Sequence, residues 1–214
     1  AQGIVGISGI DTRALTRHLR ERGAMRCGIS SIDTDPKALL DKVISSPQML
    51  GADLSAEVST PEPYLVAAIG ERRFTVAAID YGIKSMTPHR LAERGITSHV
   101  LPATSTAEQI LATGADAVFL ANGPGDPATA DAAVATVRDL LRRRVPIFGI
   151  CFGNQLLGRA YGFDTYKLGY GHRGINQPVQ DRATGKVEIT AHNHGFAVAA
   201  DTDAPSQTEF GTVE

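Results

Sequence analysis

The chain has 214 residues, of which 43% are hydrophobic and 21% charged, and its formal net charge is −2 at pH 7. This length suits one large domain, or one domain with part of another, and the hydrophobic share is enough to build a core. The near-neutral charge gives no reason to expect nucleic acid or an anionic membrane as a partner. No apolar run approaches the roughly 18 residues of a membrane span, and the two distant cysteines, Cys27 and Cys151, predict reduced thiols in a cytoplasmic protein.

For residues 1–70, the sequence predicts a compact α/β segment followed by a linker. Asp11 is placed to cap a helix that runs to about Arg22, and a strand is expected at 25–30. Asp35-Pro36 is a cap and first-turn pair that opens a second helix. From residue 45 to 73 the chain is richer in Ser, Pro, Gly and Glu, which indicates a linker with short structured pieces and a domain boundary near residue 70.

Residues 71–214 predict strands that alternate with helices through short connections. The expected strands are 74–80, 96–101, 117–121 and 145–150, and the expected helices are 86–94, a short one capped by Ser105 with Glu108, 129–144 and 154–161. Such alternation predicts an α/β fold with a doubly wound, mostly parallel sheet. Beyond Gly162 the chain becomes β-rich, with a strand at 187–191 after a hairpin turn at 183–186.

The expected strand at 145–150 runs straight into Gly149-Ile150-Cys151-Phe152-Gly153, and a helical pattern follows. This is the G-x-nucleophile-x-G elbow, with cysteine in the place of serine. The glycines allow a sharp turn, and the first amides of the helix are expected to point at the sulfur of Cys151. That environment is expected to lower the thiol pKa and to stabilise an oxyanion. The alternative is a buried, inert cysteine.

A second loop, Asn122-Gly123-Pro124-Gly125-Asp126-Pro127, follows the third expected strand. Its glycines expose backbone amides and its prolines stiffen it, at the end of a parallel sheet where ligands bind. The loop is expected to supply a second oxyanion donor beside the amide of Phe152. Two alternatives stay open. The spacing of Gly123, Gly125 and Ala128 also fits a dinucleotide fingerprint, although on the wrong strand, and the loop could be a bare turn.

A third expected loop, His192-Asn193-His194-Gly195-Phe196, follows the strand at 187–191. Asn193 offers a donor and an acceptor suited to an amino-acid substrate. His192 and His194 are both candidates for the base that a thiol nucleophile needs, and the choice between them weakens each. No cluster has metal-ligand spacing, so no metal is expected, and no G-x-x-x-x-G-K-[ST] motif predicts nucleotide phosphates.

Together, the elbow at 149–155, the loop at 122–127 and Asn193-His194-Gly195-Phe196 resemble the class I glutamine amidotransferases. Segments 9–13, 171–179 and 193–198 resemble, within them, the family of carbamoyl-phosphate synthase small chains, and the resemblance runs along the whole sequence. It implies a flavodoxin-like amidotransferase domain at 71–214, preceded at 1–70 by part of a smaller N-terminal domain and its linker.

The resemblance also implies a reaction and its residues. A thiolate attacks the side-chain amide of L-glutamine, ammonia leaves, and the glutamyl thioester is hydrolysed. Ammonia then passes to a large synthetase subunit, which binds ATP and Mg²⁺ and makes carbamoyl phosphate for arginine and pyrimidines, so no cofactor is expected on this chain. By position, Cys151 is the nucleophile and Gly123 and Phe152 give the oxyanion amides. The positions matching the substrate site are Gly123, Gly125, Phe152, Gln155, Asn193, Gly195 and Phe196.

The family's base lies in a His-Pro-Glu segment that this chain does not contain. We therefore expect an internal portion of a longer small chain, incomplete at both ends, with little glutaminase turnover by itself. Two other readings stay open: a different class I amidotransferase subunit, such as one serving anthranilate or guanylate synthesis, and a non-catalytic glutamine-binding or regulatory subunit of the same fold.

Overall fold

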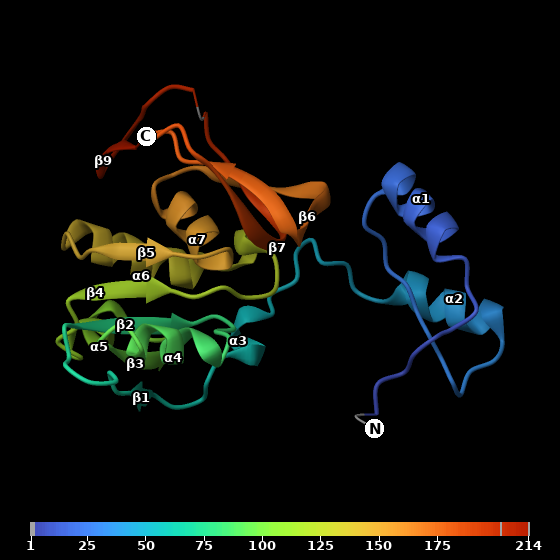
Figure 1. Cartoon of the computed structure of the whole chain (residues 1–214), viewed down its shortest axis with the longest axis horizontal. Coiled ribbons are helices and arrows are strands. Elements are labelled where there is room, and N and C mark those ends of the chain that lie inside the picture. The colour runs from blue at the N-terminus through green and yellow to red at the C-terminus, as the bar shows by residue number, and fades with distance from the viewer. Residues whose placement is uncertain (1–2, 202, 214) are drawn as a thin grey trace. The chain divides into compact units, whose positions relative to one another are not determined.

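The computed structural model describes residues 3–201 and 203–213 (Figure 1), and the chain divides into two compact units. One unit comprises Ala1–Met49 and Leu168–Gly195, and the other comprises Leu50–Lys167 and Phe196–Glu214. The domain boundary predicted near residue 70 concerns the domains of a longer protein, and it stays a prediction. Within the described ranges, no helix has both the length and the hydrophobicity that crossing a bilayer requires.

In the first unit, the two expected helices form with the expected caps. The Asp11 side chain accepts a 2.9 Å hydrogen bond from Ala14 N–H at the start of α1 (Thr12–Arg22). Asp35 does the same from Lys37 N–H, at 3.0 Å, at the start of α2 (Pro36–Ser45). The prediction of a strand at 25–30 was wrong, because these residues do not form one. Alternating apolar residues do not make a strand unless another strand supplies hydrogen-bonding partners.

The second unit is built on a five-stranded sheet of order β1-β3-β2-β4-β5. The β1 strand at its edge runs antiparallel to β3, and the other four strands are parallel to one another. The strands are β1 (Tyr64–Val66), β2 (Phe74–Asp80), β3 (Ile96–Pro102), β4 (Ala117–Leu120) and β5 (Ile147–Gly149). The predicted mostly parallel α/β sheet is confirmed, and the segment expected to be a linker contributes its edge strand.

Successive side chains along each strand point to opposite faces of this sheet, and buried apolar residues lie on both faces. On one face Ala77, Ile79 and Leu120 pack with buried residues of α5, α6 and α7, while Ala78 and Val100 belong to a smaller cluster on the other face. The helical elements of this unit are α3 (Ser55–Val58), α4 (Met86–Ala92), α5 (Ala107–Leu111), the 3₁₀ turn η1 (Pro127–Thr129), α6 (Asp131–Arg142) and α7 (Phe152–Ala160). The capping box of α5 is Thr106 with Gln109, one residue beyond the predicted Ser105 with Glu108.

The strand order reverses direction at β2, which pairs with β3 on one side and β4 on the other. Ligands of open α/β sheets bind beyond the carboxyl ends of the strands at such a switch point. The loops that follow β2 and β4 there are tied together, because Asn122 Nδ2 donates a 3.1 Å hydrogen bond to the carbonyl of Gly82.

The carboxyl-terminal part contains two pairs of strands. β6 (Asp164–Gln180) and β7 (Val187–Ala199) form a hairpin whose turn is closed by Asp181 N–H bonding the carbonyl of Lys186 at 2.8 Å. β8 (Ser206–Thr208) pairs with β9 (Gly211–Val213). The hairpin turn is confirmed, but the expected loop at 192–196 was wrong, because β7 continues through it. The partner strand β6 is long enough to extend the pairing past the predicted strand end.

Candidate active site

Cys151 lies in a strained turn between β5 and α7. Its φ of 54° and ψ of −110° lie in a region that residues other than glycine rarely adopt. The flanking glycines explain how the turn closes: a Cβ on Gly153 would lie 2.2 Å from the carbonyl oxygen of Leu120, and one on Gly149 would lie 2.6 Å from the carbonyl carbon of Gly153. The elbow expected from the sequence is therefore present.

Two backbone amides face the Cys151 sulfur. The N–H groups of Phe152, at the start of α7, and of Gly123, after β4, both donate hydrogen bonds to the Cys151 sulfur, which favours its thiolate form. Gly123 reaches this position because its backbone packs closely on Tyr81, where a Cβ would come within 2.1 Å of the Tyr81 carbonyl oxygen. The structure thus brings together three residues that the sequence had singled out from two separate loops.

The electrostatics of Cys151 differ from the expectation. Burial raises the pKa of the thiol above its ordinary value, and this outweighs the hydrogen bonds from Phe152 and Gly123 and the positive charge of Lys84, which all lower it. The prediction of a lowered pKa was wrong because desolvation of the thiolate is the largest contribution. Lys84 was missed by the sequence reasoning. The feature that could have pointed to Lys84 is its position in the loop after β2, because β2 is the neighbour of β4 in the sheet.

The loop that carries Gly123 and Gly125 is fixed by a buried carboxylate. Asp126 accepts hydrogen bonds from Gly51 N–H at 2.8 Å and Ala128 N–H at 2.9 Å. Gly125 has φ 100°, and a Cβ there would approach the Ala52 carbonyl oxygen to 2.7 Å. The segment before the sheet therefore holds the amide-lined loop in place, which the sequence did not reveal.

Gln155 and Phe196 also meet. The Gln155 side chain, on α7, donates a 2.8 Å hydrogen bond from Nε2 to the carbonyl oxygen of Phe196, and both residues are buried. The Lys167 ammonium lies 5.4 Å from the centre of the Phe196 ring. Two positions predicted to hold substrate are thus in direct contact with each other.

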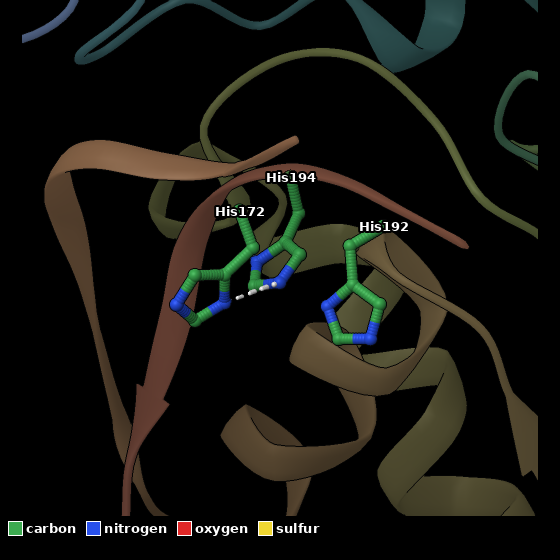
Figure 2. A group of neighbouring side chains, drawn as sticks. All are labelled: His172, His192 and His194. Carbon is green, nitrogen blue, oxygen red and sulfur yellow. Dashed lines mark hydrogen bonds between the residues drawn. The ribbon is translucent and has the colours of Figure 1, made fainter. Parts of the chain in front are cut away.

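Asn193 and Gly195 lie on β7 in the first unit, where Arg173 Nη1 donates a hydrogen bond to Asn193 Oδ1. Beside them, His172, His192 and His194 form a cluster that Figure 2 shows with the three rings turned toward one another. The sequence reasoning did not find this cluster, because His172 is on β6 and becomes a neighbour of the other two only when the hairpin forms.

Comparisons with known proteins agree with this geometry. Residues 77–213 match the family described as "Glutamine amidotransferase class-I", and residues 1–29 match "Carbamoyl-phosphate synthase small chain, CPSase domain". The chain is 67% identical over 215 residues to the carbamoyl phosphate synthase small chain of Streptomyces avermitilis. It is 56% identical over 215 residues to the protein of the same name from Mycobacterium tuberculosis.

These alignments cover 100% and 98% of this chain but 57% of each relative, so the chain spans little more than half of their length. Among solved structures, a putative GMP synthase protein from Thermoplasma acidophilum is similar with a TM-score of 0.54 and 17% identity, over 65% of this chain and 73% of that one. At that identity the likeness shows the fold alone.

Proposed function

Because residues 77–213 match its family, the chain belongs to the class I glutamine amidotransferases, and we propose that it is part of the glutamine-hydrolysing small chain of a carbamoyl-phosphate synthase. The observation that carries this proposal is the presentation of Cys151 in a strained turn with the amides of Phe152 and Gly123 directed at its sulfur. The names of the relatives at 67% and 56% identity support the choice within the family.

In the proposed reaction, the Cys151 thiolate forms a C–S bond to the side-chain amide carbon of L-glutamine. The negative charge that develops on the amide oxygen is stabilised by the N–H groups of Gly123 and Phe152, which donate toward the same region. The amide nitrogen takes up the proton that the thiol gave up, the C–N bond breaks and ammonia leaves, and water then hydrolyses the thioester to glutamate and the thiol. Gly125, Gln155, Asn193, Gly195 and Phe196 are assigned to holding the substrate.

The partner in this proposal is a large synthetase subunit that receives the ammonia. ATP and Mg²⁺ belong to that subunit, because attack by a thiolate on an amide requires neither. A cytoplasmic location fits this chemistry, since a nucleophilic thiol works only while reduced and Cys27 and Cys151 are not joined in a disulfide.

The first test is labelling of Cys151 by a glutamine-like electrophile such as a γ-glutamyl diazoketone, followed by peptide mass mapping. We expect a stoichiometric label at Cys151, protection by L-glutamine, and no label in Cys151→Ser. Cys27→Ser is the matched control, because Cys27 is the other, exposed cysteine, and it should label as the unmodified chain does. Labelling of Cys151 without protection by glutamine would contradict the proposal and favour a module that does not bind glutamine there.

The second test concerns turnover. The chain contains no His-Pro-Glu segment, and a thiol without its base is acylated slowly. We expect the 214-residue chain to release glutamate much more slowly than a longer chain that includes such a segment. Equal rates of glutamate release from the two would show that a base is already present within these residues.

A further inference from the structure

We propose that His172, His192 and His194 form a Zn²⁺ site on the β6–β7 hairpin. Their ligand nitrogens all lie within 4.8 Å of one another. The cluster is distinct from the Cys151 elbow in its residues and its chemistry, and the proposal does not depend on the assigned glutaminase activity.

The backbone of the hairpin places the three side chains together. His192 and His194 are two residues apart on β7, so their side chains leave the same face of the strand. His172 comes from β6, which approaches β7 closely: a Cβ on Gly171 (φ 74°) would lie 2.5 Å from the carbonyl oxygen of His194. Glycine at 171 therefore permits the close approach that brings the His172 ring beside the other two.

The ring geometry suits convergence on one point. His172 Nδ1 and His194 Nε2 are 3.1 Å apart. Two imidazole nitrogens bound to the same tetrahedral Zn²⁺ at about 2.0–2.1 Å would be separated by about 3.3 Å, so this hydrogen-bonded pair needs little change in separation to bind one ion. The ring planes cross at 78° for His172 and His194, 60° for His172 and His192, and 46° for His192 and His194, so no two of the rings are stacked in parallel.

The third ligand is His192. Its Nδ1 is buried and has no hydrogen-bond partner within the described part of the chain, and Figure 2 shows this nitrogen facing the other two rings. A buried polar atom without a partner costs free energy, and a metal ion between the three rings would satisfy it. To complete the site, the His192 ring has only to move until its nitrogen lies as close to the other two nitrogens as they would lie to each other around one ion.

The donor set selects the metal. Three neutral imidazoles without a carboxylate suit Zn²⁺ and other late first-row ions, not Mg²⁺ or Ca²⁺, which prefer oxygen ligands. In the hydrogen bond between His172 Nδ1 and His194 Nε2 one nitrogen carries the proton; on metal binding that proton moves to the other nitrogen of its own ring, so both nitrogens present lone pairs and each imidazole stays neutral. With three protein ligands, the fourth position of a tetrahedral ion is open to water.

The test is calorimetric titration of the chelator-treated chain with ZnCl₂. We expect one tight site per chain, no competition from Mg²⁺, and affinity at least tenfold weaker in His172→Gln and in His192→Gln. His18→Gln is the matched control, because His18 is an exposed histidine on α1 in the same unit, and it should bind as the unmodified chain does. Since thiols also bind Zn²⁺, Cys27→Ser/Cys151→Ser should retain the site.

Nuclear magnetic resonance of the unmodified chain gives an answer that does not depend on the folding of variants. On addition of Zn²⁺, the imidazole signals of His172, His192 and His194 should shift while those of the other three of the six histidines stay in place. The proposal is overturned if Zn²⁺ does not bind, if His192→Gln binds as tightly as the unmodified chain, or if replacing the two cysteines removes the site.

Discussion

At the scale of single residues, the state of Cys151 is decided by the balance between burial and nearby positive charge. Burial raises the pKa of the thiol, whereas the Lys84 ammonium and the amides of Phe152 and Gly123 lower it. Because the raised pKa belongs to the folded chain, the thiol of the native protein stays protonated to a higher pH than the same thiol after unfolding.

This balance predicts a pH effect that can be measured by alkylation with iodoacetamide in a Cys27→Ser background. The midpoint of the rate against pH should be higher for the native chain than for the chain in urea. Lys84→Gln should move the native midpoint higher still, since it removes a charge that stabilises the thiolate. The control is Lys186→Gln, in the exposed hairpin turn, which should leave the midpoint unchanged. An unchanged midpoint in Lys84→Gln would contradict the role given to that charge.

Gly153 is the residue whose replacement should disturb the elbow most directly. In Gly153→Ala the new methyl group would meet the Leu120 carbonyl oxygen at 2.2 Å, so β4 and α7 must separate. We expect a loss of about 1–3 kcal/mol in the free energy of unfolding in urea, together with slower labelling of Cys151. Gly169→Ala is the control, because a Cβ there meets nothing within 4 Å, and it should change neither quantity.

At the scale of elements, the loop after β2 depends on one buried carboxylate. Asp80 accepts hydrogen bonds from the N–H groups of Gly82 at 2.8 Å, Ile83 at 2.7 Å and Thr60 at 2.8 Å. It therefore fixes both the loop that carries Lys84 and the segment that leads into β1.

Replacing Asp80 by alanine should leave these backbone donors without their acceptor. We expect Asp80→Ala to lower the free energy of unfolding by about 1–3 kcal/mol, measured in urea. Asp131→Ala is a control of the same chemistry at the surface: its side chain is 84% exposed and pairs with Arg159, so the change should stay within about 0.5 kcal/mol. Similar losses for the two variants would mean that the buried carboxylate is not specifically needed.

The sequence predicted most elements whose signals are local. Asp11 and Asp35 cap helices where a cap was expected, and the elbow glycines give the turn around Cys151. It failed where the outcome depends on distant neighbours. β7 passes through 192–196 because β6 lies beside it, and the strand at 25–30 does not form.

The same reason explains the site residues that the sequence did not reveal. Lys84 acts on Cys151 from a different loop, and the three histidines meet across a hairpin. The sign of the thiol pKa shift depends on how deeply Cys151 is buried, and burial is a property of the packed chain. Motifs therefore identified the nucleophile and its amides, but not the charges and rings gathered around them by the fold.

At the scale of the whole molecule, the hydrophobic core is unevenly divided between the two units. The main cluster of buried apolar residues runs from Ala77 to Ala160, all within the second unit. In the first unit, neither α1 nor α2 has a buried residue, so burial contributes less to their stability than it does in the second unit. Short helices with little packing are marginal in water.

This division predicts that the two units lose structure at different urea concentrations, with the first unit unfolding earlier. Hydrogen exchange followed by mass spectrometry should show fast exchange in α1 and α2 and slow exchange in β2 and β4. A matched pair of leucines tests the cause. Leu156→Ala removes a side chain that is fully buried and should cost about 2–5 kcal/mol, whereas Leu15→Ala, at a position 46% exposed on α1, should cost about 0.5 kcal/mol. Slow exchange in α1 together with a large loss in Leu15→Ala would instead mean that the first unit has a core of its own in solution.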